Sequence, residues 1–182
     1  MVFYLDLRED ARRAHLLDSL FACMDSRQRD RFDEIIAHVA VPDHHHHNVI
    51  EVNETIDALS VPDRIKEDMH GVYGILAAAE AHVHGCEVTE THFHEVGNAN
   101  GIRNALAICA GFYVLSPDEV VATPIQTGEG ETECAHGVLS IPAPATAAIL
   151  EGLPLASPLL PGERCTPTSA ALIRHFVTSY SE

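Results

Sequence analysis

The sequence predicts an α/β fold in which helices pack on a mixed sheet within a single compact domain. Short runs of β-forming residues alternate along the chain with segments whose apolar residues recur at helical spacing, which is the pattern of α/β proteins. The chain has 182 residues and 46% hydrophobic content, enough to bury one sizeable core. One principal domain is therefore expected.

The first half of the chain indicates a strand followed by helices. Residues 2–7 are a short apolar run of β character, and residues 9–24 place leucines at helical spacing. A second helix is expected over 26–40, with Ser26 as its N-cap. Residues 48–85 hold two helical patterns that break near residues 60–62, which predicts an antiparallel helix pair that ends at Gly85.

The second half indicates strands that alternate with helices. Residues 86–96 alternate in polarity and predict a strand, and residues 98–115 return to helical spacing. Further strands are expected at 120–126 and 133–141, with a turn over the glycines of 128–131. Prolines at 142, 144 and 167 predict the starts of two last helices.

Charge and composition exclude several classes of function. Eleven Lys and Arg against 27 Asp and Glu give a formal net charge of −16, which repels nucleic acid and anionic lipid. The acidic N-terminus does not resemble an export signal, and no apolar run is long enough to span a bilayer. Five widely spaced cysteines with no C-x-x-C pair fit a reduced compartment, so we expect a soluble, cytoplasmic protein.

Metal binding is the first hypothesis, because 13 histidines are more than a chain of this size needs for packing. His92 and His94 are spaced i, i+2, so on a strand both imidazoles project from one face, and Glu95 beside them offers a carboxylate ligand or a base. Two histidines do not complete a site. Spacing alone leaves open that both are hydrogen-bonded residues near the core.

Other residues could complete such a site. His82 and His84 diverge by about 200° near a helix end, so at most one of them is expected to join, and His84 is favoured because it is nearest the chain reversal. Cys134 and His136 offer a thiolate and an imidazole that suit nickel, copper or zinc, although Cys134 could equally be a buried core residue.

Two more segments carry reactive groups. Four consecutive histidines would bind divalent nickel weakly in almost any exposed context, which would not by itself indicate catalysis; they are His44, His45, His46 and His47. Thr166 and Thr168 flank Pro167 at a predicted helix start, where hydroxyls more often cap the helix than take part in chemistry. There is no G-x-S-x-G motif of a serine hydrolase.

Four strings occur in an order that resembles the LarC family of nickel-insertion proteins: EAHVHG, HFHEVG, CAHGVLSIPAPAT and TPTSAAL. The family's histidine-rich stretch has a counterpart in the tract 44–47. The resemblance covers residues 44–182, after a divergent part at 1–43. It implies CTP-dependent insertion of nickel, with zinc as an alternative ion, into a pyridinium bisthiocarboxylate mononucleotide, giving the nickel-pincer cofactor of lactate racemase.

The resemblance also implies which residues act. Glu95, Cys134, Thr166 and Thr168 fall on motif positions as candidate catalytic residues, and the histidines of HFHEVG and CAHG as metal ligands. The family typically continues into a CTP-binding C-terminal domain, so a separate chain is the expected source of nucleotide binding. A homo-oligomer is a further expectation.

Three departures favour an alternative, a non-catalytic metal-binding or scaffold paralogue. The family's glycine-rich acidic N-terminal loop is replaced here by FYLDLREDARR. Asn100 and Asn104 stand where the family has carboxylates, and a neutral amide cannot act as a general base. The third expected departure is the family's C-terminal CTP-binding domain, which we do not expect within these 182 residues. A purely structural module whose histidines serve packing is the remaining reading.

Overall fold

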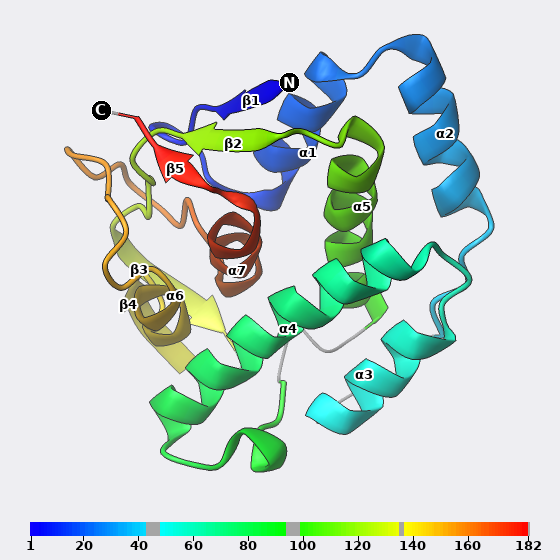
Figure 1. The fold of residues 1–182 in the computed structure, drawn as a ribbon. Coiled ribbons are helices and arrows are strands. Elements are labelled where there is room, and N and C mark those ends of the chain that lie inside the picture. The colour runs from blue at the N-terminus through cyan, green and yellow to red at the C-terminus, as the bar shows by residue number, and fades with distance from the viewer. Residues whose placement is uncertain (43–47, 94–98, 135–136, 182) are drawn as a thin grey trace.

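A three-stranded parallel sheet lies at one side of the molecule in the computed structural model, which describes residues 1–42, 48–93, 99–134 and 137–181 (Figure 1). Its strands are β1 (Val2–Leu5), β2 (Glu119–Ala122) and β5 (Ser179–Tyr180), in the order β1-β2-β5. β1 and β2 pair from Val2↔Glu119 to Leu5↔Ala122. The α/β class predicted from the sequence is confirmed, although the sequence did not indicate β5.

Helices cover one face of this sheet and leave the other open. Phe3 and Leu5 are buried, whereas Tyr4 on the opposite face is 71% exposed. Beneath the buried face lie α1 (Arg13–Cys23), α5 (Ala99–Leu115) and α7 (Pro167–Phe176) (Figure 1). Phe112 of α5 joins these layers, because its ring meets Phe3 edge-on at 5.8 Å and stacks on Phe176 at 3.9 Å.

The long helix α4 (Asp63–His84) crosses the molecule below this layer, and α3 (Val49–Ala58) packs along it (Figure 1). Asn53 contacts His70 at 2.9 Å, and Lys66 donates to the carbonyl of Asp57 at 2.7 Å. The contact moves from Asn53 to Asp57 along α3 while it moves back from His70 to Lys66 along α4. The two helices therefore run antiparallel. Gly85 ends α4 in the left-handed conformation at φ +66°, which confirms the predicted C-cap.

The N-cap of helix α2 (Ser26–Ala37) lies one residue earlier than expected. This residue is Asp25, and the expectation that Ser26 caps the helix is wrong. Asp25 accepts a hydrogen bond from the Gln28 backbone at 2.8 Å, while the Gln28 side chain accepts from the Asp25 backbone at 3.0 Å. This reciprocal capping box satisfies two backbone donors, which a serine at the next position could not do.

The single strand expected at 133–141 is instead an antiparallel hairpin of β3 (Gly130–Cys134) and β4 (Gly137–Ile141). The predicted turn at 128–131 is likewise wrong, because Gly130 and Glu131 already pair with Ile141 and Ser140. The chain reverses beside Gly137, whose φ of +93° favours glycine. Parallel and antiparallel pairings thus lie in two sheets, and the hairpin leads into α6 (Pro144–Ile149).

The strand predicted over residues 86–96 is also wrong for the part that the structure describes. Residues 88–90 form a short 3₁₀ helix, η1 (Val88–Glu90), and the following extended backbone makes one isolated antiparallel bridge, from His92 to Asn48. The backbone of Glu90 donates to Glu87, and that of Thr91 donates to Val88. Because these local hydrogen bonds pair backbone N–H groups of the segment, those groups do not need a partner strand.

Candidate functional site: a histidine-bearing end of helix α4

The segment that carries His92 is held in place by its neighbour Phe93. Phe93 is 1% exposed, and its ring meets Tyr73 of α4 edge-on at 5.7 Å. His92 itself is exposed, and its backbone pairs with Asn48, the residue that directly follows the four-histidine tract in the sequence. The fold therefore brings the start of α3 beside the HFH motif, although 44 residues separate Asn48 from His92 in the sequence.

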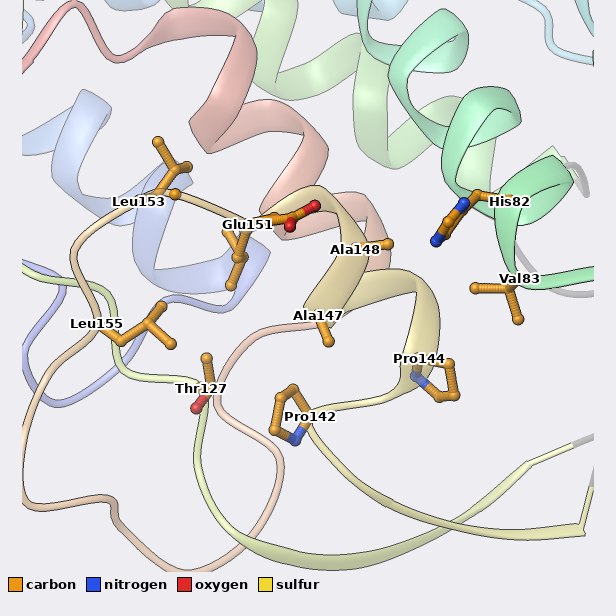
Figure 2. Close-up of a pocket in the computed structure, with 12 residues that line it drawn as sticks. His82, Val83, Thr127, Pro142, Pro144, Ala147, Ala148, Glu151, Leu153 and Leu155 are labelled. Atoms are coloured by element: carbon orange, nitrogen blue, oxygen red, sulfur yellow. The ribbon is translucent and has the colours of Figure 1, made fainter.

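The two histidines at the end of α4 point to different surroundings, as their spacing predicts. His84 lies 3.5 Å from the carboxylate of Glu80, one helical turn before it. His82 instead lines an open pocket at the end of α4 (Figure 2). The structure thus places His82 at a hollow that no sequence pattern predicted.

Several candidate residues lie outside the described part of the chain. The tract 44–47, His94, Glu95 and His136 are among them, and for Cys134 the structure describes only its backbone position at the end of β3. Within the ranges 1–42, 48–93, 99–134 and 137–181, no three His, Cys, Asp or Glu side chains gather as a metal site would require. The role of these residues as ligands therefore remains a prediction.

Thr166 and Thr168 occupy the start of α7. Thr166 is the N-cap, and its hydroxyl accepts from the backbone of Ser169 at 3.3 Å and lies 3.0 Å from the Ser169 hydroxyl. Thr168 is half-buried in the first turn. Burial raises the pKa of the adjacent Cys165 thiol well above its ordinary value, which keeps that sulfur protonated and a poor nucleophile. Capping accounts for the contacts of Thr166, and a catalytic role for either threonine stays a prediction.

Asn100 and Asn104, which stand at the expected carboxylate positions, both contact arginines. The Asn104 side-chain oxygen accepts a hydrogen bond from Arg13 of α1, and that of Asn100 accepts from Arg103 at 3.3 Å. Arg103 also donates to the carbonyl of Val41 at 2.9 Å. Because a positively charged guanidinium group lies beside each amide oxygen, neither Asn100 nor Asn104 is a favourable ligand for a metal cation.

A buried hydrogen bond between Asp68 and His175 joins α7 to α4, and no sequence pattern predicted it. Asp68 is 4% exposed, and its carboxylate lies 2.9 Å from His175 and 3.3 Å from Arg64. The His175 ring lies so close to Gly71 that an added Cβ there would come within 2.4 Å of Cε1. This tight packing indicates a structural role for the pair, and no ligand contact is needed to explain it.

The open pocket has a volume of about 690 Å³ and lies between the end of α4, helix α6 and the loop that follows α6. Figure 2 shows Ala148 between the side chains of His82 and Glu151, with Pro142 and Leu155 lower in the view, and all five residues line the pocket. Pockets of this size hold small organic ligands. No sequence motif could have found it, because its walls come from three separate segments, 82–83, 127 and 142–155.

Comparison with known proteins places the chain in a family. The family model described as nickel insertion protein matches residues 5–182. The chain belongs to the nickel insertion protein family. Within the described residues, no helix is long and apolar enough to cross a membrane.

Among the curated relatives of this family member are three named pyridinium-3,5-bisthiocarboxylic acid mononucleotide nickel insertion protein. Those of Staphylococcus saprophyticus, Geobacillus kaustophilus and Desulfitobacterium hafniense are 38%, 36% and 34% identical over 135, 156 and 154 residues. The matches cover 74%, 82% and 85% of this chain but 34%, 38% and 38% of the relatives. The chain therefore spans little more than a third of these relatives' length. No solved structure matches it.

Proposed function

We propose that this chain takes part in inserting nickel into a pyridinium mononucleotide, a step in the maturation of the nickel-pincer cofactor. The observation that carries the proposal is the Asn48–His92 bridge, which joins the residue after the four-histidine tract to the HFH motif. A nickel ion bound loosely by one histidine segment would have a short path to the other. The family to which the chain belongs and the names of its relatives support the same chemistry.

The roles of individual residues follow from their chemistry. Neutral imidazoles are good ligands for divalent nickel, so His92 and His94 would bind the ion, with His84 and His136 as further candidates. Glu95 would accept a proton or balance the ion's charge, and Cys134 would offer a soft sulfur ligand. Because the chain spans about a third of its relatives, a CTP site would come from a further segment or a separate chain.

One observation favours a second candidate, a metal-binding or scaffold protein without catalytic activity. At position 104, where the family pattern has a carboxylate, the neutral Asn104 accepts a hydrogen bond from the Arg13 guanidinium, which already places a positive charge beside it. Such a protein would still bind nickel through histidines such as His92 and His94. Nickel transfer to a pyridinium bisthiocarboxylate mononucleotide separates the two candidates. The transfer is measured from the absorption spectrum of the mononucleotide after CTP and a CTP-binding partner are added.

The first test measures nickel and zinc binding in a variant that lacks residues 44–47. Equilibrium dialysis with elemental analysis compares this background with the same background carrying His92→Ala and His94→Ala. We expect about one tightly bound ion per chain in the background and its loss in the double variant.

A matched control removes two other imidazoles. His15 is half-buried and His38 is exposed, and their rings lie within hydrogen-bonding distance of the backbone carbonyls of Asp6 and Glu34. The pair His15→Ala and His38→Ala should leave nickel binding unchanged. If deletion of 44–47 alone abolishes uptake, the proposal fails and the scaffold candidate replaces it.

A further inference from the structure

The walls of the pocket between α4 and α6 are fixed before any ligand arrives. Backbone hydrogen bonds on both sides of Leu155, from Ile125 to Pro154 and from Ala156 to Ile125, are each 2.9 Å long. Arg174 of α7 donates to the carbonyls of Ile149 and Glu151 at 2.7 Å and 3.2 Å, which holds the end of α6. A preformed pocket loses little entropy when it binds a rigid ligand.

Most of the lining is apolar, and part of it remains open to water. Val83 and Leu155 are large apolar side chains in the pocket, yet they are 38% and 49% exposed. Pro142 and Pro144 add two ring surfaces to the same hollow (Figure 2). Exposed apolar groups that line a concavity are typical of a ligand site, and saturated rings beside aliphatic side chains suit a planar aromatic ligand.

The polar groups of the pocket indicate the charge of that ligand. Only three of the twelve lining residues have polar side chains, His82, Thr127 and Glu151. Thr127 is 1% exposed and its hydroxyl donates to the carbonyl of Gly128 at 3.2 Å, which leaves His82 and Glu151 at the rim. None of these lining residues is Lys or Arg, and the chain has a net charge of −16. A positively charged ring is therefore favoured over an anionic one.

We propose that this pocket holds the pyridinium ring of a mononucleotide, with Glu151 beside the ring's positive charge and His82 donating a hydrogen bond to an acidic substituent. The inference rests on the proposed function and adds a site to it. The ring would lie against Pro142 and Leu155, next to the end of α4. His82 would thus link the ring site to the helix that precedes the HFH motif.

The test uses two mononucleotides that differ in ring charge. Nicotinamide mononucleotide carries a cationic pyridinium, and its reduced form has a neutral dihydropyridine of nearly the same shape. Isothermal titration of the 182-residue chain should give a dissociation constant about tenfold lower for the cationic form, a difference of about 1.4 kcal/mol. Glu151→Gln should reduce that preference to within about twofold.

Two further variants control for general effects. Ala148→Trp fills the hollow between His82 and Glu151 and should abolish binding of both probes, with circular dichroism showing that the chain still folds. Glu54→Gln removes an exposed carboxylate on α3, away from the pocket, and should leave the preference intact. Equal affinity for the two probes, an unchanged preference in Glu151→Gln, or no binding at millimolar probe would each overturn the inference.

Nickel binding measured on the same variants separates this inference from the proposed function. If the chain shows no preference for the cationic probe but nickel binding still depends on His92 and His94, only the pocket assignment fails. If nickel binding at those histidines is also absent, the proposed function fails with it.

Discussion

At the scale of single residues, Thr146 carries a fully buried hydroxyl with no hydrogen-bond partner among the described residues. An unpaired buried hydroxyl lowers stability because it loses its bonds to water. We expect Thr146→Val to leave the free energy of unfolding unchanged or raise it by up to about 1 kcal/mol. Urea denaturation followed by circular dichroism measures the change.

A second threonine provides the control for this substitution. Thr55 is 7% exposed, and its hydroxyl donates to the carbonyl of Glu51 at 2.9 Å. Thr55→Val should lower the free energy of unfolding by about 1 kcal/mol, because a satisfied bond is lost. A Thr146→Val variant that is destabilised as much as Thr55→Val would show that the Thr146 hydroxyl is paired in solution.

Cysteine reactivity should follow burial. Cys109 and Cys165 are buried, and burial raises the pKa of both thiols above the ordinary value, so neither forms thiolate at neutral pH. Cys23 is exposed. Because thiolate is the nucleophile, iodoacetamide at pH 8 should label Cys23 at least about tenfold faster than the two buried thiols, as peptide mass spectrometry would show.

Denaturant supplies the control for this labelling experiment. Cys109 and Cys165 should be labelled only as urea unfolds the chain, in step with the loss of circular dichroism signal. Rapid labelling of Cys165 in the native protein would mean that the start of α7 opens, and it would make Cys165 a reactive group beside Thr166.

At the scale of elements, two glycines with positive φ allow the cost of backbone strain alone to be compared with the cost of strain plus a steric clash. Gly128, which precedes β3, has φ +82°, and an added Cβ would lie 1.8 Å from the carbonyl oxygen of Gly162. Gly85 ends α4 at φ +66° with nothing within 4 Å of an added Cβ. We expect Gly128→Ala to lower the melting temperature far more than Gly85→Ala, which should cost about 1 kcal/mol.

The outcome of this comparison tests the placement of the loop before the hairpin. The Gly162 backbone bonds to Glu129, and the backbone of Arg164 donates to Thr127, so the two loops support one another. Similar stability of the two alanine variants would contradict that close approach. Thermal unfolding followed by circular dichroism decides it.

Element prediction from the sequence succeeded where local signals and tertiary packing agree. The predicted helix over residues 98–115 is α5, and the break near residues 60–62 separates α3 from α4. It failed at 86–96, where alternating polarity suggested a strand but local hydrogen bonds formed η1. It also failed at β5, a two-residue strand that exists only because β2 lies beside it.

At the scale of the whole molecule, the net charge of −16 should make stability depend on salt. Like charges on a folded chain repel one another, and raising sodium chloride from about 0.01 M to about 0.15 M shortens the screening length from about 30 Å to about 8 Å. We expect the melting temperature to rise by about 2–5 °C. Differential scanning calorimetry in the presence of a chelator measures the shift without divalent metal.

Tetramethylammonium chloride distinguishes screening from specific binding of sodium. It should raise the melting temperature as much as sodium chloride at equal ionic strength, because screening depends on ionic strength alone. A melting temperature that falls with both salts would mean that the many surface ion pairs, such as Arg8–Asp6 and Arg12–Asp10, outweigh the repulsion.

The sequence by itself determined the α/β class, most helices, the family and the identity of the candidate metal ligands. These depend on local periodicity, on capping and on motif strings, all of which are properties of neighbouring residues. It also indicated that His82 and His84 diverge, because helical geometry fixes the angle between them.

Only the tertiary structure decided which distant segments meet. The bridge from Asn48 to His92, the contact of Arg13 with Asn104, and the pocket between His82 and Glu151 each join residues far apart in the sequence. Such contacts depend on how the buried faces of α4, α5 and α7 pack together, and burial is a property of the whole core that no local pattern encodes.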